Sequence, residues 1–312
     1  YSRIQAAQEK NSSTENTVYT YFEDELTDQI INDLMNIKGY TKKQATNLLY
    51  SGGLKVYTTQ DSKIQNILDE EYADPSNYPD TVQYELDYAL TVTDPDGNQV
   101  NYSKEMLQLY FQNEDPDFDL LFDSPEDGQT YVDKYKASIL ANGSKVLAER
   151  VNFAPQPQSS MSVIDQHTGY VKALIGGRGE KTASLTLNRA TDTTRQPGST
   201  FKILAAYSAA LDAGGLTLAS VQDDAPYTYA GANGKSVNNY DRRYRGFTTL
   251  REAITDSINI VTVKTLAQAG VSLGWQYVQE YGFTTVDSRD MNEALALGGI
   301  TQGVSNLEPV SY

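Results

Sequence analysis

The chain has 312 residues, enough for one large domain or two smaller ones with a buried core. Its 25 basic and 41 acidic residues give a net charge of −16, which argues against nucleic acid or an anionic membrane surface as a partner, because phosphate binding needs a basic face. No cysteine and one histidine, His167, exclude thiol catalysis, disulfides and zinc sites built on thiolates or several histidines. We therefore expect no cofactor and no metal ion.

The first 53 residues predict a polar start followed by two helices. Residues 1–16 are polar and typical of a linker. Residues 17–53 carry apolar side chains at helical spacing, interrupted at Lys38-Gly39. Thr41 is then the expected N-cap of the second helix, and the following Ser51-Gly52-Gly53 is its expected end.

Residues 54–159 predict a mixture of short elements. Leu54 to Thr59 alternates in polarity and predicts a strand, and Asp61 is placed to cap a helix that runs to about Tyr72. A further strand is expected over 84–93.

An acidic turn follows that strand, at Asp94-Pro95-Asp96-Gly97-Asn98. A calcium loop is one interpretation, but Gln99 occupies the position that such a loop reserves for glycine. We therefore expect a hairpin turn that leads into a second strand. The proline-containing stretch over 154–158 predicts a domain boundary.

Residues 160–312 show a different sequence pattern from the rest, which predicts one hairpin followed by helices. The expected elements are a hairpin over 161–177, a helix over 199–213, a helix over 250–269 that breaks near Asp256, and the start of a last helix near Asn306. This order predicts an α+β fold. No run of about 18 apolar residues that would cross a membrane occurs in the chain.

The stretch from Arg195 to Lys202 carries the first candidate for chemistry. Pro197-Gly198 forces a turn, and the apolar run behind it places Ser199 at a helix N-terminus. Lys202 lies three residues on, so both side chains share one helix face. A serine hydroxyl needs a base to become a nucleophile, and a lysine amine can serve if burial and the helix dipole lower its pKa. Backbone N–H groups at the same helix end can stabilise an oxyanion.

A second motif, Ser257-Ile258-Asn259, makes the first one specific. A hydroxyl in such a turn can relay protons between the lysine and a leaving group, and the asparagine amide can orient both the lysine and a substrate amide. Ser-x-x-Lys followed by Ser-x-Asn is the motif pair of penicillin-binding proteins and serine β-lactamases.

The chain resembles the bifunctional (class A) penicillin-binding proteins beyond these motifs. The similar stretches, besides 195–202, are Tyr50 to Thr59, Asn239-Tyr240-Asp241, Gly246, Thr249 to Ala253, Leu297-Gly298-Gly299 and Gly303 to Glu308. The resemblance implies an antiparallel sheet flanked by helices. It also implies four segments: a remnant of a preceding glycosyltransferase domain (1–16), interdomain linker helices (17–53), the N-terminal part of the transpeptidase domain with a variable insert over 74–158 (54–159), and the catalytic core (160–312).

The same resemblance implies a D,D-transpeptidase that cross-links peptidoglycan. Ser199 would attack the D-Ala-D-Ala end of a stem peptide with Lys202 as general base, while Ser257 and Asn259 relay protons and position the substrate. β-Lactams would acylate the same serine. The parent protein is expected to be anchored in the membrane, to act outside the cytoplasm and to carry a glycosyltransferase domain.

One departure from the family concerns its third motif, Lys-Thr/Ser-Gly, which occurs nowhere in the 312 residues. Lys264-Thr265 is followed by leucine and is expected within a helix. We therefore expect a chain that stops before this motif and is inactive alone, with a separate C-terminal fragment as one way to complete the site. Ile203 and Asn306 stand where the family often has proline.

Other functions remain open at this point. A serine β-lactamase usually has Ser-Asp-Asn as its second motif and a group that activates water, and rapid cephalosporin turnover would identify it. A non-enzymatic β-lactam sensor or scaffold of the same fold would form a stable adduct without cross-linking. His167 as a catalytic base, or Trp275 and the 23 tyrosines as a glycan platform, are less specific alternatives, since a turn histidine and scattered aromatics are ordinary in folded proteins.

Overall fold

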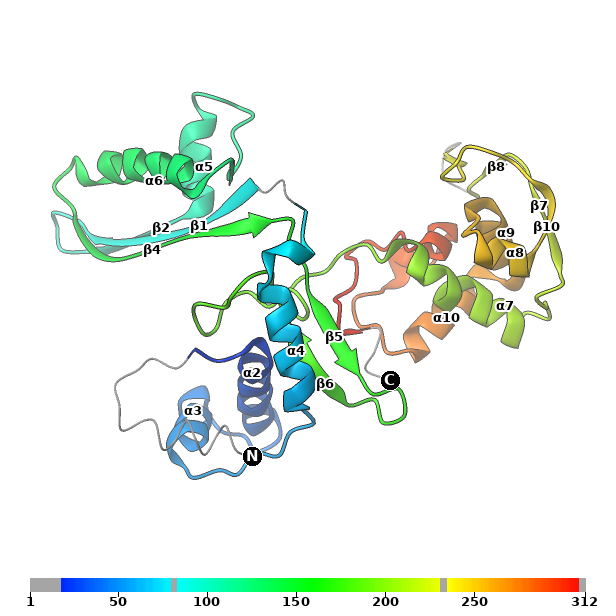
Figure 1. Ribbon diagram of the computed structural model, residues 1–312, viewed down its shortest axis with the longest axis horizontal. Coiled ribbons are helices and arrows are strands. Elements are labelled where there is room, and N and C mark those ends of the chain that lie inside the picture. Colours follow the sequence, from blue (N-terminus) through cyan, green and yellow to red (C-terminus); the bar gives the residue numbers. More distant parts are fainter. Residues whose placement is uncertain (1–17, 80–82, 231–234, 309–312) are drawn as a thin grey trace. The chain divides into compact units, whose positions relative to one another are not determined.

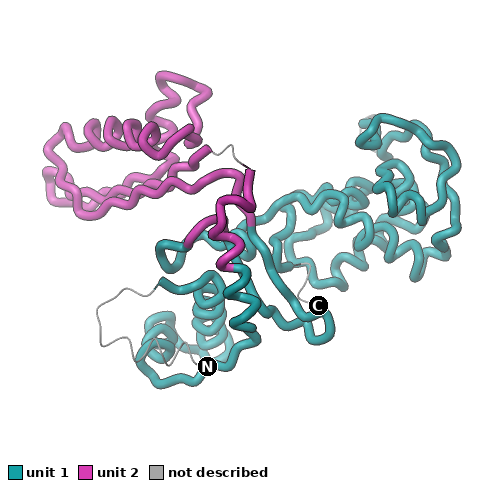
Figure 2. The backbone as a smooth tube through the Cα atoms, viewed as in Figure 1, with its two compact units in different colours: residues 1–68, 160–176, 181–312 teal, residues 69–159, 177–180 magenta. Residues whose placement is uncertain are grey.

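The computed structural model describes residues 18–79, 83–230 and 235–308, which form two compact units (Figure 2). Unit 1 comprises residues 1–68, 160–176 and 181–312, and unit 2 comprises residues 69–159 and 177–180. Both units combine helices with antiparallel strands, so the predicted α+β class is confirmed.

Unit 2 is a small antiparallel sheet with helices on one face (Figure 1). Strand β1 pairs with β4 along one edge and with β2 and β3 along the other. The elements are β1 (Gln83–Thr93), β2 (Gln99–Ser103), α5 (Lys104–Gln112), β3 (Leu121–Phe122), α6 (Pro125–Leu140) and β4 (Lys145–Gln156), preceded by the 3₁₀ turn η1 (Pro75–Asn77).

Alternation along β1 explains this arrangement. Leu86, Tyr88, Leu90 and Val92 are buried, because every second side chain of a strand points to the same face. They pack with apolar residues of α5 and α6 in one hydrophobic cluster. The predicted hairpin turn is confirmed: Asp94 accepts hydrogen bonds from the backbone N–H and the side chain of Asn98.

Unit 1 begins with helices, and the sequence predicts the N-caps of two of them. They are α2 (Tyr21–Asn36), α3 (Lys42–Ser51) and α4 (Ser62–Ala73), of which α4 runs on into unit 2. Thr41 is the N-cap of α3, with Gln44 completing a capping box, and Asp61 accepts from the first N–H groups of α4, both as predicted. The hairpin of β5 (Met161–Ile164) and β6 (Val171–Ile175) is also confirmed.

The rest of unit 1 is largely helical and is built around α9 (Figure 1). Its elements are η2 (Gly198–Thr200), the π-helix η3 (Lys202–Tyr207), α7 (Ser208–Asp212), β7 (Val221–Asp224), β8 (Tyr227–Thr228), β9 (Ser236–Val237), β10 (Gly246–Thr249), α8 (Leu250–Thr255), α9 (Asn259–Ala269), α10 (Val271–Glu280), η4 (Ser288–Asp290) and η5 (Glu293–Leu297). Apolar residues of α9, among them Ile260, Val263 and Leu266, are fully buried against η3, α10 and η5.

One predicted local structure is wrong. Residues 54–59 form no strand: most of their side chains are exposed, and no described strand pairs with them. Thr59 Oγ1 donates to the carbonyl oxygen of Val171, but alternation without a buried face or a pairing strand does not make a strand. The boundary predicted over 154–158 overlaps the last residues of β4, whose pairing with β1 extends to Gln156, and the chain passes from unit 2 to unit 1 just after it, between Ser159 and Ser160.

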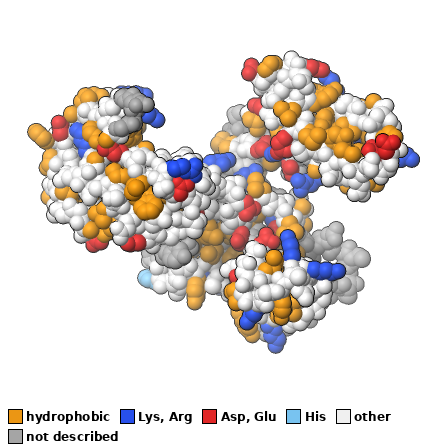
Figure 3. All heavy atoms as spheres, turned by 180° about the vertical axis from the view of Figure 1, so that it is seen from behind, with side chains coloured by type: hydrophobic (Ala, Val, Ile, Leu, Met, Phe, Trp, Pro, Cys, Tyr) orange, Lys and Arg blue, Asp and Glu red, His pale blue; other side chains and the backbone are white. Residues whose placement is uncertain are grey.

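Two further predictions fall wholly or partly outside the described residues. The linker predicted over 1–16 lies outside the described residues. Only the start of the helix expected near Asn306 falls on described residues. There Ser305 and Glu308 exchange the two hydrogen bonds of a capping box. Among the described helices, none is long and apolar enough to cross a membrane. Acidic and basic side chains are interspersed on the face drawn in Figure 3.

Candidate active site

Ser199 lies on a tight turn at the start of the expected helix. Gly198, with φ of 58°, opens the 3₁₀ turn η2, a conformation that glycine adopts without strain. The Ser199 side chain is exposed, whereas Phe201 and Lys202 behind it are 1% and 3% exposed. The turn therefore presents one hydroxyl to solvent directly above buried residues.

The helix over 199–213 is confirmed in position but not in type. It begins as η2, continues as the π-helix η3 and becomes α-helical only in α7. π-Helical turns are rare in proteins, and those that occur are often found at functional sites. Lys202 is the first residue of this stretch, so the irregular turn begins at the candidate base.

The nucleophile turn is fixed by the segment 298–304, whose similarity to the family is visible in the sequence but whose contact with residues 195–198 is not. Arg195 and Val304 exchange both backbone hydrogen bonds, each 2.9 Å long, as an isolated antiparallel bridge. Gln196 accepts from the backbone N–H of Ile300 at 2.8 Å. A Cβ on Gly298 would lie 2.5 Å from the carbonyl oxygen of Gly198, so only glycine allows this close approach. No local sequence signal assigns these partners.

The Ser-x-Asn turn connects two helices. Helix α8 ends at Thr255, and Asn259 opens α9. Ser257 adopts φ of 53°, a left-handed conformation that costs energy for a residue with a side chain. Strain of this kind persists only where surrounding contacts hold it.

Lys202 provides those contacts. Its amine donates to the Ser257 carbonyl oxygen at 2.6 Å, to Ser257 Oγ at 2.8 Å and to Asn259 Oδ1 at 2.6 Å. Three acceptors match the three N–H bonds of an ammonium group. The structure thus brings together three of the four predicted site residues, and the fourth, Ser199, precedes Lys202 by one turn. Among the described residues, no hydrogen bond joins the Ser199 hydroxyl to the other three.

Burial lowers the pKa of Lys202 to about 8, because a charged amine loses its hydration there. The neutral form, which can accept a proton, would then be present in roughly a quarter of the molecules at pH 7.5. We expect the ¹³Cε resonance of Lys202 to titrate near pH 8 in the 312-residue chain, and its absence from the spectrum of Lys202→Met assigns it. A midpoint at the ordinary value of 10.5 would contradict a tuned base.

The other candidates lie apart from this cluster. His167 is exposed in the turn between β5 and β6, where its backbone N–H donates to Asp165. Trp275 is partly buried against the core around α9 and donates to the carbonyl of Asp287. Among the described residues, no group of three or more acidic or histidine side chains is arranged to hold a metal ion.

Comparison with known proteins agrees with this geometry. Residues 160–296 match the family model described as "Penicillin binding protein transpeptidase domain". The match contains the Ser-x-x-Lys turn, the Ser-x-Asn turn and all the elements between them. Residues 160–296 therefore form a penicillin-binding protein transpeptidase domain.

Curated relatives extend the match along the chain. Penicillin-binding protein 1A of Clostridium perfringens is 30% identical over 277 residues, which are 87% of this chain and 26% of the relative. Penicillin-binding protein 1A of Neisseria flavescens is 46% identical over 133 residues, 41% of this chain and 16% of the relative. The chain thus spans about a quarter or less of the length of these relatives.

Solved structures support the fold. The crystal structure of penicillin-binding protein 1A from Haemophilus influenzae superposes with a TM-score of 0.52 at 21% identity, covering 90% of this chain and 45% of that one. The resemblance deduced from the motifs is confirmed by the family model and the curated relatives, and the solved structure confirms the fold.

Proposed function

We propose that this chain is the acyl-transfer segment of a D,D-transpeptidase that cross-links peptidoglycan stem peptides through an acyl-enzyme on Ser199. The observation that carries the proposal is the buried amine of Lys202, held by Ser257 and Asn259 one turn behind an exposed serine. An amine with a lowered pKa, one turn from a serine at a helix start, supports the roles of general base and nucleophile.

The reaction follows from these positions. Ser199 Oγ attacks the carbonyl carbon of the penultimate D-Ala while its proton passes to the neutral amine of Lys202. The amide bond to the terminal D-Ala breaks, and Ser257 passes a proton from Lys202 to the leaving nitrogen. An amine of a second stem peptide then attacks the ester, its surplus proton returns through Lys202 to Ser199 Oγ, and a cross-link replaces the lost D-Ala.

β-Lactams would enter the same first step. Attack of Ser199 opens the four-membered ring, and the ring nitrogen takes the proton but stays tethered to the acyl group. Since no fragment leaves, a second amine has no vacated space to enter and the adduct persists. The name of the family, and those of the relatives, support this inference.

The wider setting is part of the proposal. The relatives are several times longer than the matched region, and their class suggests a membrane-anchored protein that acts outside the cytoplasm and carries a glycosyltransferase domain. The Lys-Thr/Ser-Gly motif does not occur in residues 1–312, so a site that needs it must obtain it from outside these residues.

Reaction with a fluorescent penicillin tests the function. The 312-residue chain and the full-length protein that contains it are incubated with the reagent, and the adduct is weighed and then located by trypsin digestion. We expect the full-length protein to carry it on the peptide of residues 196–202, and the 312-residue chain to carry little or none.

Other outcomes would discriminate. An adduct of equal yield in the 312-residue chain would overturn the need for the Lys-Thr/Ser-Gly motif from outside it while keeping the nucleophile. Rapid turnover of a chromogenic cephalosporin would indicate a β-lactamase. An adduct on another peptide, or none in the full-length protein, would refute the proposal.

A further inference from the structure

Helix α9, which begins with Asn259, has no N-cap side chain of its own. The residue at its N-cap position is Ile258, which makes no capping hydrogen bond. Its side chain is 1% exposed and packs with Tyr207, Leu250 and Val261. The first N–H groups of a helix have no partner within the helix, so a buried apolar N-cap leaves them to be satisfied from elsewhere.

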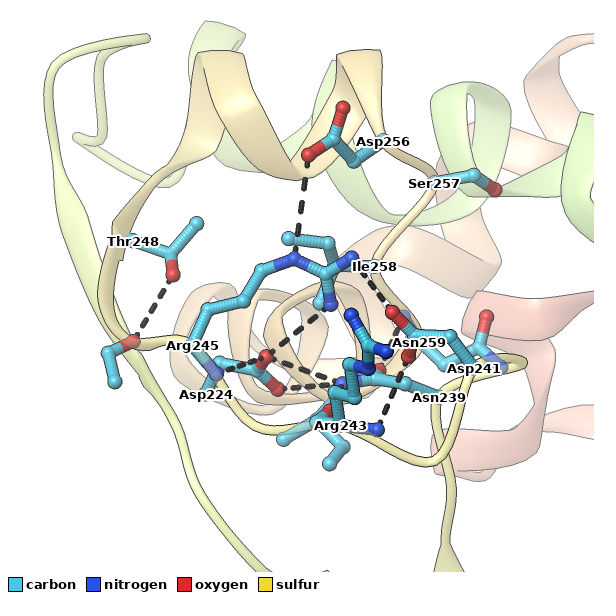
Figure 4. A network of polar contacts seen from close by, with 12 residues as sticks. Asp224, Asn239, Asp241, Arg243, Arg245, Thr248, Asp256, Ser257, Ile258 and Asn259 are labelled. Carbon is cyan, nitrogen blue, oxygen red and sulfur yellow. Dashed lines mark hydrogen bonds and ion pairs between the residues drawn. The ribbon is translucent and has the colours of Figure 1, made fainter.

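Asn239 satisfies them from a separate segment (Figure 4). Its Oδ1 accepts from the backbone N–H of Asn259 at 3.0 Å and of Ile260 at 3.2 Å. The preceding residue, Asn238, accepts from the Asn259 side-chain amide at 2.7 Å through its carbonyl oxygen. Both the backbone and the side chain of Asn259 are therefore held by residues 238–239.

The buried carboxylate of Asp224, at the end of β7, fixes the orientation of the Asn239 amide. Asn239 Nδ2 donates to Asp224 Oδ1 at 2.8 Å and Oδ2 at 3.1 Å, and to the carbonyl oxygen of Arg243 at 2.8 Å. Asp224 is 0% exposed and Asn239 is 3% exposed. A flipped amide would turn its oxygen toward these acceptors and its N–H groups toward the helix N-terminus, so only one orientation fits.

Arg245 connects the same carboxylate to the far side of the Ser257 turn. Its backbone N–H donates to Asp224 at 2.9 Å, and its guanidinium bonds Asp241 at 2.9 Å and lies 4.0 Å from Asp256. Asp256 directly precedes the strained Ser257. The turn is thus held at Asn259 through Asn239, and at Asp256 through Arg245 (Figure 4).

We propose that Asn239 and Asp224 are a positioning pair for the acyl-transfer site: Asp224 orients Asn239, which caps α9 and sets the place of Asn259 and, through it, of the Lys202 amine. This inference deepens the proposed function and rests on it for the acylation readout alone. Neither residue touches the reacting atoms; both act through Asn259.

Loss of the cap has a distinct electrostatic consequence. Asn259 Oδ1 is one of three acceptors for the Lys202 amine. An acceptor stabilises the ammonium form, so displacing Asn259 lowers the pKa of Lys202 further. A variant that only destabilises the fold reduces the active fraction equally at every pH and leaves this pKa unchanged.

An exchange of the two side chains tests the pair. Asn239→Asp sets two carboxylates against each other, and Asp224→Asn removes the charge that orients the amide. The double variant again pairs one amide with one carboxylate, and its carboxylate faces the N–H groups of α9, where negative charge is favourable. Thr265→Val is the matched control, because it removes a buried hydroxyl that donates to the Val261 carbonyl oxygen at 2.7 Å in the second turn of the same helix, and it contacts neither Asn239 nor Asn259.

Three quantities are measured for each variant: the melting temperature, the Lys202 ¹³Cε titration in the 312-residue chain, and the penicillin acylation rate of the full-length protein across pH. We expect Asp224→Asn to shift the titration downward, and both single variants to slow acylation at least about tenfold, as a displaced catalytic group does. The exchange should recover most of both, and Thr265→Val should change neither the titration nor the acylation rate.

Two results would overturn the inference. One is an unchanged titration and pH profile in folded Asp224→Asn. The other is an exchange that regains its melting temperature but not the wild-type titration. If the wild-type protein forms no acyl adduct, the proposed function fails while the titration still decides whether the pair positions Lys202.

Discussion

Replacing Ser199 by alanine is expected to abolish the penicillin adduct of the full-length protein. The hydroxyl is the only atom group removed, and acyl transfer cannot proceed without an atom that bonds the substrate carbonyl. Ser199 is exposed and makes no side-chain hydrogen bond among the described residues, so the fold should not change. The measurement is intact mass after incubation with excess penicillin, together with the melting temperature.

Ser208→Ala is the matched control, since it makes the same chemical change two turns further along the same helical run. Its hydroxyl donates to the Leu204 carbonyl oxygen and contacts none of the candidate residues. We expect this variant to acylate like the wild type. Retention of the adduct in Ser199→Ala would show that another residue is the nucleophile, and the proposed mechanism would be wrong.

The features that sequence reasoning found are those governed by short stretches of chain. The capping box at Thr41 and the alternation of β1 depend on residues within a few positions, and the structure reproduces both. The motif pair fixed the identity of Lys202, Ser257 and Asn259 as candidates, and the structure places their side chains in contact.

The features it missed depend on partners that are distant in the chain. The strand expected over 54–59 had the right pattern but finds neither a pairing edge nor a core to cover. Gly298 approaches the backbone of Gly198 from about a hundred residues away. Ile258 is buried in the core, and the cap of α9 comes instead from Asn239. A rule that considers only neighbouring residues does not predict a cap from a distant segment.

Replacing Lys202 by methionine is expected to slow acylation by about 10²–10⁴-fold, the usual contribution of a general base. Methionine is similar in length and unbranched, so it fills the buried space that the lysine side chain occupies. The nucleophile stays in place, and only the proton acceptor is lost. Acylation rates of the two proteins at several pH values measure the effect, and the wild-type rate should rise through pH 8 while the variant lacks this rise.

The same variant separates function from stability. At neutral pH the wild type buries a charged amine, which is costly, whereas methionine leaves the acceptors on Ser257 and Asn259 unpaired. These effects oppose each other, so we expect the free energies of unfolding to agree within about 2 kcal/mol at pH 7. A large loss of stability would instead make Lys202 a structural residue.

The pH dependence of stability gives the final test of a lowered pKa. Between the folded value of about 8 and the ordinary 10.5, the unfolded chain binds more protons at Lys202 than the folded one. The free energy of unfolding of the wild type should therefore rise with pH in this window, relative to Lys202→Met, by up to about 1.4 kcal/mol per pH unit. Parallel denaturation curves for the two proteins between pH 8 and 10 would show that the folded state does not perturb this amine, and the proposed base would lose its physical basis.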